Sequence, residues 1–549
     1  MLFFCPTPYI SCLSIQRLDQ FHIIKDWIFS LSAATDPVPL KELSSGSQEL
    51  FYLTELKETE EDCCTLDTPV HIHAVPFIFA IGVTIALIIE INLLPLVFTK
   101  GVVSDHELCT ALCEKVLQDG GSSVDAAIVG ALCLGIVHPH VSGVGGGGVM
   151  LVHNARQNRT KVINFQGSAP KALTENMVQN VSDEGLSVGV PGMLLGLHRA
   201  HQMYGSLSWN NIISRAADLA REGFNVSQSL ASAISQLEAD KIEGRIRDTF
   251  IPDGQALRFG SYIRRPDLAE VLETGVRYFY QGAISEEIEK EVQANGGVLN
   301  REDIRNYSVE VQQPLESQYN EHIIKVPPLP SAGAVLIAAL NLLETLHLWE
   351  NDVTENQTSR WIDAALLTAS ALVSELGDPQ FNSSVIDHLS GQAAGLQQRM
   401  KDVLQLLYAS NSTIHPFLTE QLTGQVVIMG PDDLIVSVAS SLNRPFGSRI
   451  MTESGIILNS LILDFFWPNQ RSGLLESNQP GKRPLTFLMP AVMVPTWNKC
   501  GTYMALSSSG GTNRLNEVTK VCSDLKGQVS KVEVLSPSKV GHAFLFQPP

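Results

Sequence analysis

A threonine at the start of an apolar segment is the residue best suited to covalent chemistry. Leu422-Thr423-Gly424 leads into the strand-like residues 425–429 (QVVIM). A threonine hydroxyl in mid-chain is a weak nucleophile because no base is built into its own residue. If the peptide bond between Leu422 and Thr423 is cut, the new α-amine can take the proton from the Thr423 hydroxyl. A threonine that opens a strand is far more often structural, so the surroundings decide its role.

Two glycine-containing segments fit other known motifs. Residues 143–148 fit GxGxxG, a phosphate-binding pattern, but they follow an expected helix at 123–137 and lead into the strand-like residues 149–152. This order favours a closely packed structural loop over a nucleotide site. Residues 185–189 fit GxSxG, the turn that carries a serine nucleophile. That turn needs a buried strand before it, and residues 179–184 are polar, so a serine hydrolase is disfavoured.

The elements around these motifs alternate between helix and strand. Apolar residues recur at helical spacing in residues 211–224 and again in residues 358–376. Residues 425–429 and 434–439 are β-branched runs on either side of the turn-forming residues 430–433 (GPDD), which predicts a β-hairpin. Helices first and strands later predict an α+β fold in which helices cover sheet layers.

Composition indicates a large globular chain with an acidic surface. The 549 residues are 44% hydrophobic, which is enough for a sizeable core, and the formal net charge is −19. Acidic residues spread along the chain argue against nucleic acid as a partner. The nine cysteines form no CxxC pair, so the sequence predicts no metal site, and no motif in it calls for a cofactor.

A long apolar segment occupies residues 74–98. Residues 74–89 carry no charge, and the apolar character resumes after Glu90. A helix of about 20 residues crosses a bilayer, so this segment predicts a single transmembrane anchor, with a buried core helix as the alternative. Residues 1–73 contain an acidic run at 55–62 and are expected to form a largely disordered tail.

Glycosylation sequons favour a cytosolic tail and an extracellular or lumenal body. All Asn-x-Ser/Thr sequons follow the apolar segment, and the first 73 residues contain none. The chain is therefore expected to be a single-pass type II membrane protein. If the body is lumenal, Cys109 and Cys133 are candidates for a disulfide. The candidate glycosylation sites are Asn158, Asn180, Asn225, Asn306, Asn356, Asn382 and Asn411.

The surroundings of Thr423 resemble the start of the small subunit of gamma-glutamyltransferases, closest to the type 7 branch. The similarity runs through residues 427–433 (VIMGPDD), 440–443 (SSLN), 446–448 (FGS), 455–459 (GIILN), Asp464-Phe465, 480–485 (PGKRPL) and 510–512 (GGT). Before the threonine, residues 120–127, 143–148, 189–193 and 377–379 are also similar to that family. The resemblance covers roughly residues 101–504.

The resemblance implies the αββα sandwich of the N-terminal nucleophile hydrolases, made as a precursor that cuts itself into two subunits. Residues 1–73 would be the tail, 74–98 the anchor, 99–422 the large-subunit region and 423–549 the small-subunit region. The family's small subunit continues further beyond the position of Thr512 than this sequence does. The small-subunit region is therefore expected to be truncated at its C-terminus.

The resemblance also implies cleavage of the γ-glutamyl amide of glutathione and its conjugates. After autocleavage between Leu422 and Thr423, the Thr423 hydroxyl would attack that amide with Ser441 as its hydroxyl partner. The backbone N–H groups of Gly510 and Gly511 would form the oxyanion hole, which gives a γ-glutamyl-enzyme. Water, or an acceptor amino acid or dipeptide, would then release the glutamyl group.

Substrate-binding positions are kept only in part. Asn443 and Asp464 would hold the α-amino group of the substrate, and Thr486 its α-carboxylate. Gln166 stands where the family has an arginine, so a charge-assisted pair becomes a neutral hydrogen bond at a cost of about 1–3 kcal/mol. The other departures are Leu461 for a glutamate, Phe487 for a serine and Gln425 for a histidine.

Two functions of different classes remain open. The first is a membrane-anchored glutathione hydrolase or gamma-glutamyltransferase, which we favour because the nucleophile, its partner and the glycine pair are kept. The second is a catalytically weak or inactive homologue that acts as a membrane-bound binding protein, as the altered pocket positions suggest.

Overall fold

The computed structural model describes most of the chain beyond residue 100. The described segments are residues 101–174, 184–240, 242–319, 321–345, 355–374, 422–466, 481–496, 503–507 and 543–546, with a few single positions. The chain divides into two units, Met1–Pro95 with Pro549, and Leu96–Pro548. The fold below is that of the second unit. Residues 1–73 and, apart from Gly82, the predicted anchor lie outside the described residues, and within these no helix meets the length and apolarity needed to span a membrane.

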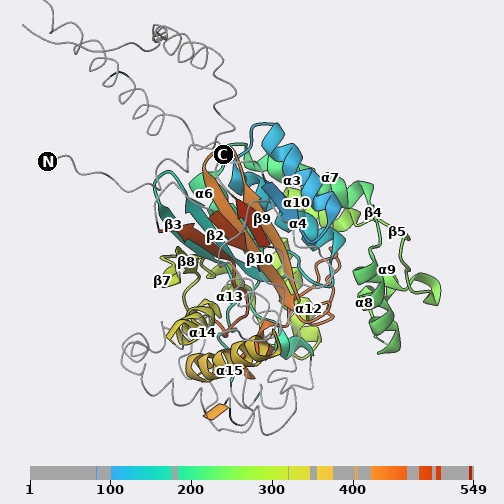
Figure 1. Cartoon of the computed structure of the whole chain (residues 1–549). Coiled ribbons are helices and arrows are strands. Elements are labelled where there is room, and N and C mark those ends of the chain that lie inside the picture. Colours follow the sequence, from blue (N-terminus) through green and yellow to red (C-terminus); the bar gives the residue numbers. More distant parts are fainter. Residues whose placement is uncertain are drawn as a thin grey trace, which may run out of the picture. The chain divides into compact units, whose positions relative to one another are not determined.

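A six-stranded antiparallel sheet carries the candidate threonine (Figure 1). Thr423 is the second residue of β9, and β9 and β10 form the predicted hairpin. Asp433 in the connecting turn has a φ of 59°, a conformation that aspartate tolerates in turns. In spatial order the strands are β1 (Gly101–Ser104), β9 (Leu422–Met429), β10 (Leu434–Asn443), β2 (Gly147–Asn154), β3 (Arg159–Asn164) and β6 (Glu310–Gln312).

A second antiparallel sheet packs against the first. Side chains alternate along the strands of both sheets, so that one set from each, including Val427, Ile435, Val492 and Tyr503, meets in a shared apolar layer. The Ser437 hydroxyl of β10 donates across this layer to the Leu506 carbonyl at 2.7 Å. In spatial order the strands are β13 (Ala543–Phe546), β12 (Tyr503–Leu506), β11 (Ala491–Pro495), β8 (His322–Val326) and β7 (Leu315–Tyr319).

Helices cover the two outer faces, which completes four layers in the order αββα. Val426, Ile428 and Val438 of the first sheet pack against α4 and its neighbours, whereas Ile324 and Met493 of the second sheet pack against α14 and α15. Figure 1 shows these two groups of helices on opposite sides. The first group includes α3 (Glu107–Gln118), α4 (Ser123–Val137), α6 (Met193–Tyr204), α7 (Trp209–Glu222) and α10 (Pro266–Thr274), and the second is α14 (Gly333–Thr345) and α15 (Glu355–Ser374).

The helix boundaries follow local signals in the sequence. Every residue of α4 is buried, which explains why its sequence after the first turn is apolar on all sides. Ser122 and Asp125 cap its first turn reciprocally, each accepting from the other's backbone N–H at 3.0 Å. Ser208 caps α7, and Gly223 ends it at a φ of 99°. The helices predicted at 211–224 and 358–376 are confirmed as α7 and α15, each within three residues.

Shorter elements complete the described part of the chain. These are β4 (Phe224–Asn225), β5 (Tyr262–Ile263), α8 (Gln228–Ala239), α9 (Arg245–Phe250), α11 (Val276–Gln281), α12 (Ala283–Ala294), α13 (Arg301–Arg305), and the 3₁₀ turns η3 (Glu184–Ser187), η4 (Pro252–Gly254) and η5 (Leu461–Phe466).

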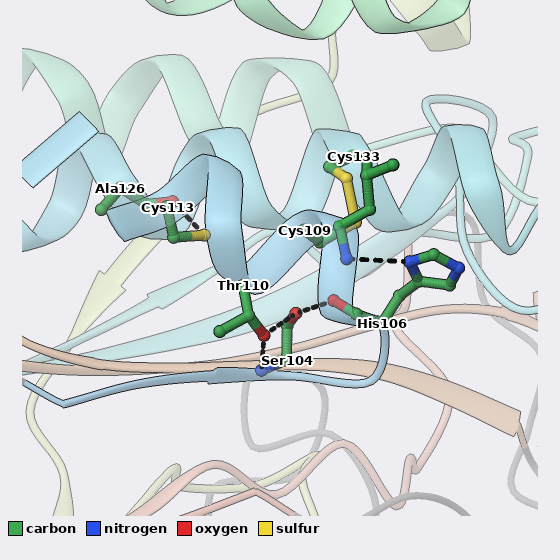
Figure 2. Close-up of a disulfide and its surroundings, with 8 residues drawn as sticks. Ser104, His106, Cys109, Thr110, Cys113, Ala126 and Cys133 are labelled. Atoms are coloured by element: carbon green, nitrogen blue, oxygen red, sulfur yellow. Dashed lines mark hydrogen bonds between the residues drawn. A yellow bond between two sulfur atoms is a disulfide. The ribbon is translucent and has the colours of Figure 1, made fainter. Parts of the chain in front are cut away.

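Helices α3 and α4 are joined by the disulfide anticipated from the sequence. Cys109 and Cys133 are bonded, with their Cα atoms 5.6 Å apart (Figure 2). Cys113 on α3 is a buried free thiol that donates to the Ala126 carbonyl at 3.1 Å. Burial raises the pKa of this thiol well above its usual value, which leaves it unreactive.

Removal of this disulfide is expected to destabilise the protein. The bridge spans 24 residues, so the Cys109→Ser/Cys133→Ser variant should lose about 3 kcal/mol of unfolding free energy. Urea denaturation of both proteins measures the difference. A reductant should bring the unmodified protein to the level of the variant and leave the variant unchanged. Equal stability of the two oxidised proteins would contradict the expectation.

Three of the predicted glycosylation sites lie on the surface. Asn158, Asn225 and Asn306 are all exposed. Asn180, Asn382 and Asn411 lie outside the described residues, and the side chain of Asn356 is not described. The modification itself remains a prediction.

Candidate active site

The first strand of the hairpin holds Thr423 in the interior of the first sheet. β9 lies between β1 and β10, and Thr423 is 3% exposed. Gly424 pairs with Ser440 and Leu422 with Asn443, so a bulge in β10 separates the two pairs. A bulge re-aims the side chains around it, and this one lies directly opposite the threonine.

The bulge brings Ser441 to the bond that is predicted to be cut. Its hydroxyl donates to the carbonyl oxygen of Leu422 at 2.5 Å and accepts the backbone N–H of Asn443 at 2.8 Å. The Leu422 carbonyl is the one that an attack by the Thr423 hydroxyl would convert to an oxyanion. A donor already in place on that oxygen can stabilise the charge as it forms.

The two positions predicted to bind an amino group lie close to this bulge. Asn443 has a φ of 80°, and its amide donates to the Ser460 carbonyl at 2.9 Å. Asp464 is half-buried on the 3₁₀ turn η5, which begins at Leu461, the next residue after Ser460. The hydrogen bond of Asn443 therefore links the end of β10 to the turn that carries Asp464.

A buried asparagine that sequence analysis did not assign a role organises this turn. Asn459 accepts from the N–H groups of Gly189 and Leu461 at 2.9 and 3.1 Å, and it donates to the carbonyls of Gly145 and Gly189 at 2.7 and 2.9 Å. All its amide groups are thus engaged, and η5 is held against the glycine-rich loop. The only sequence signal was its place in the GIILN motif.

The glycine-rich loop at residues 143–148 is a closely packed structural loop, as the order of elements predicts. A Cβ on Gly145 would lie 2.1 Å from the Ile457 carbonyl oxygen, and one on Gly146 would lie 2.4 Å from that of Ser441. Backbone atoms therefore occupy the space that a side chain at either position would need, and only glycine fits. The other motif is also structural, because the Ser187 hydroxyl donates to the Glu184 carbonyl of its own turn at 2.6 Å.

The structure brings Gln166 and Thr486 into one region. Gln166 is fully buried, and its amide donates at 2.6 Å to the carbonyl of Pro484, two residues before Thr486. Thr486 is buried, and its hydroxyl accepts the Leu488 N–H at 3.3 Å. Gly510 and Gly511 lie outside the described residues, so the predicted oxyanion hole stays a prediction.

Asp105 is a second residue that sequence analysis did not identify. It follows β1, and its carboxylate accepts the backbone N–H of Gln425 at 2.7 Å. Gln425 is two residues beyond Thr423, so this bond fixes the start of β9 relative to β1. The residue lies between β1 and α3, where the sequence gives no motif that would single it out.

Buried histidines should make the stability of this protein depend on pH. Desolvation lowers the pKa of His138, His140 and His153 from 6.5 to about 3. The unfolded chain therefore binds more protons below pH 6.5, and stability should fall as pH decreases from 6.5 towards 3, by up to about 1.4 kcal/mol per pH unit for each histidine.

Urea denaturation at pH 7.5 and pH 5.5 measures this effect. Replacing the fully buried His153 by asparagine removes one of the three titrating groups. The unfolding free energy of this variant should therefore change less with pH, by the amount that one histidine contributes. A stability that does not change across this interval would contradict the expectation.

Comparison with known proteins identifies relatives of this chain. The family model for gamma-glutamyltranspeptidase matches residues 109–529. Glutathione hydrolase 7 of Mus musculus is 42% identical over 518 residues, which cover 90% of this chain and 78% of that protein. Glutathione hydrolase proenzyme 1 of Schizosaccharomyces pombe is 31% identical over 450 residues, covering 76% and 70%.

A solved structure supports the layer arrangement. The crystal structure of cephalosporin acylase from Bacillus halodurans superposes with a TM-score of 0.63 at 22% identity, covering 78% of this chain and 80% of the acylase. The predicted α+β fold of N-terminal nucleophile hydrolases and the resemblance to type 7 members are thereby confirmed. Because the family model matches residues 109–529, which is 421 of the 549 residues, this chain belongs to the gamma-glutamyltranspeptidase family.

Proposed function

We propose that this protein is a glutathione hydrolase or gamma-glutamyltransferase that cuts its own chain before Thr423 and then uses Thr423 as the nucleophile. The observation that carries the proposal is the hydrogen bond from Ser441 to the Leu422 carbonyl, because it activates the one peptide bond whose cleavage creates the catalyst. The names of the curated relatives, glutathione hydrolase 7 and glutathione hydrolase proenzyme 1, support the choice of substrate.

Turnover follows from the chemistry of a free N-terminal threonine. The α-amine of Thr423 takes the hydroxyl proton, the oxygen attacks the γ-carbonyl, and the C–N bond of the γ-glutamyl amide breaks as the proton passes to the leaving amine. The product is an ester on Thr423. Water or an acceptor amine then attacks this ester and restores the hydroxyl. Gly510 and Gly511 are proposed to hold the oxyanion in both steps.

Substrate recognition is proposed to use the elements around the bulge. Asn443 and Asp464 would bind the α-amino group of the glutamyl unit, since both lie at the junction of β10 and η5. Thr486 and Gln166 would bind the α-carboxylate, which is attached to the same carbon as the amino group. With both groups on the α-carbon held, the γ-carbonyl is the end of the unit left for attack by Thr423.

The body is proposed to lie outside the cytosol, behind a single anchor at residues 74–98. Support comes from the length of that apolar segment, from the sequons at exposed asparagines, and from the disulfide between Cys109 and Cys133, which persists in oxidising compartments. The protein would then be single-pass type II, with the large subunit at 99–422 and the small subunit at 423–549.

The experiment that tests the proposal is a reducing gel of the purified protein with N-terminal sequencing of the smaller band, combined with turnover of a γ-glutamyl anilide. A band that starts at Thr423, together with release of the anilide, is the expected result. A chain that stays whole and inactive would favour the other candidate, a membrane-bound binding protein, which the buried apolar Leu461 at a substrate-binding position would then explain.

A further inference from the structure

The hydrogen bonds of β9 show to which side the backbone nitrogen of Thr423 points. In an antiparallel strand the N–H and C=O of one residue face the same neighbouring strand, and those of the next residue face the other. The Leu422 carbonyl faces β10, because it accepts from the Ser441 hydroxyl at 2.5 Å. The Gly424 carbonyl also faces β10, because it accepts from the Ser440 hydroxyl at 3.4 Å. Thr423 lies between these two residues, so its nitrogen points to the β1 side.

The carboxylate of Asp105 lies on the same side of β9. β1 ends at Ser104, opposite Val426, and Asp105 is the next residue. Its half-buried carboxylate accepts the backbone N–H of Gln425 at 2.7 Å. The nitrogens of Gln425 and Thr423 point to the same side and are about 7 Å apart along the strand. The Asp105 carboxylate is therefore also about 7 Å from the nitrogen that cleavage would convert to an α-amine.

The other titratable groups described around the start of β9 differ from Asp105 in charge or exposure. Desolvation lowers the pKa of His106, the N-cap of α3, so this ring is neutral at pH 7. The His138 ring lies 5.1 Å from that of His106, and burial lowers its pKa to about 3. Glu107 is exposed, so water and salt screen its charge. Asp464 lies on η5, beyond the bulge in β10. The half-buried carboxylate on the β1 side is that of Asp105.

We propose that the Asp105 carboxylate stabilises the protonated α-amine of Thr423 after the chain is cut, and so sets the pH below which this amine cannot act as the base. A nearby negative charge favours the ammonium form, whereas only the neutral amine can take the hydroxyl proton. Asp105 acts through the amine and is therefore a positioning residue. The inference rests on the proposed function, since it concerns the base of the same site.

The pKa of this amine can be measured without turnover. Competitive acetylation of the purified cut protein at a series of pH values, with mass spectrometry of the peptide that begins at Thr423, follows the fraction of neutral amine. An ordinary α-amine has a pKa of about 7.7–8.0, and one carboxylate at about 7 Å should raise it by about one unit. Asp105→Asn keeps an acceptor for the Gln425 N–H but removes the charge, so its midpoint should be about one unit lower than that of the unmodified protein.

The pH profile of kcat/KM for a γ-glutamyl anilide should show the same shift, because this ratio reports the ionisations of the free enzyme. At pH 7 the Asp105→Asn variant should turn over about tenfold faster, since about ten times more of its amine is neutral. A purely structural role of Asp105 would instead lower the rate at every pH and leave the midpoint unchanged. The matched control is Glu107→Gln, which removes an exposed carboxylate two residues away and should keep the midpoint within about 0.3 pH units.

The pKa of the amine and the turnover can fail independently. A raised midpoint in a cut protein that turns over no γ-glutamyl donor would support the role of Asp105 and reject the proposed activity. Turnover with equal midpoints in the unmodified protein and Asp105→Asn would overturn the role and leave the activity. If Asp105→Asn does not fold, the acetylation midpoint of the unmodified protein decides, and a value of about 8 or lower overturns the role. A chain that is never cut has no such amine, which rejects both.

Discussion

Replacing Thr423 by alanine is expected to leave the chain in one piece and to abolish turnover of a γ-glutamyl anilide. The variant lacks the oxygen that attacks the Leu422 carbonyl during cleavage and the γ-carbonyl during catalysis. Both steps should therefore fail, and loss of a covalent nucleophile lowers kcat by about four orders of magnitude or more. A reducing gel and the release of nitroaniline measure the two effects.

Two further variants make this result specific. Thr423→Ser keeps a hydroxyl on the same residue and should retain cleavage at a reduced rate. Thr368→Ala removes another buried threonine hydroxyl, which donates to the Ala364 carbonyl within α15, and should cut and turn over normally. Cleavage of Thr423→Ala at the normal rate would show that another group breaks the chain, and the proposed mechanism would then fail.

The parts of the fold that the sequence predicts are those with local causes. α4 is apolar from Ala126 to Val137 and begins at a capping box, so its bounds follow from the sequence. The hairpin of β9 and β10 follows from two β-branched runs on either side of four turn residues. In both cases the determining residues are close together in the chain.

The second sheet has no such local cause. β8 pairs with β11, so His322–Val326 lies beside Ala491–Pro495, and the two segments are far apart in the sequence. Each strand is short, and its pattern of residue types does not indicate which strand it pairs with. The pairing depends on α14 and α15 on one face and on the first sheet on the other, which only the assembled core provides.

The candidate site also combines features that the local sequence predicts with features that depend on distant segments. Residue types and spacing near Thr423, with the family resemblance, place the nucleophile, but they do not show that Ser441 bonds to the Leu422 carbonyl. That contact depends on a bulge between Ser440 and Asn443, which is a property of the pairing register. The orientation of the Gln166 amide likewise depends on a carbonyl more than 300 residues away, that of Pro484.

Replacing Ser441 by alanine is expected to slow cleavage of the chain by about 100-fold without unfolding it. The variant removes the donor to the Leu422 carbonyl at 2.5 Å, and loss of one oxyanion donor typically lowers a rate by 10²- to 10³-fold. The fraction of uncut chain after expression, followed over time on a reducing gel, measures the rate. Ser441→Thr restores a hydroxyl and should recover most of it.

The matched control for this variant lies on the same strand. Ser437 is fully buried on β10, and its hydroxyl also donates to a carbonyl, that of Leu506, at 2.7 Å. Ser437→Ala removes a hydrogen bond of the same type and should lose a similar stability of about 1 kcal/mol. Because its partner is not the bond to be cut, it should mature at the normal rate. Equal slowing of both variants would assign the effect to the sandwich core, whereas slowing of Ser441→Ala alone assigns it to the carbonyl of Leu422.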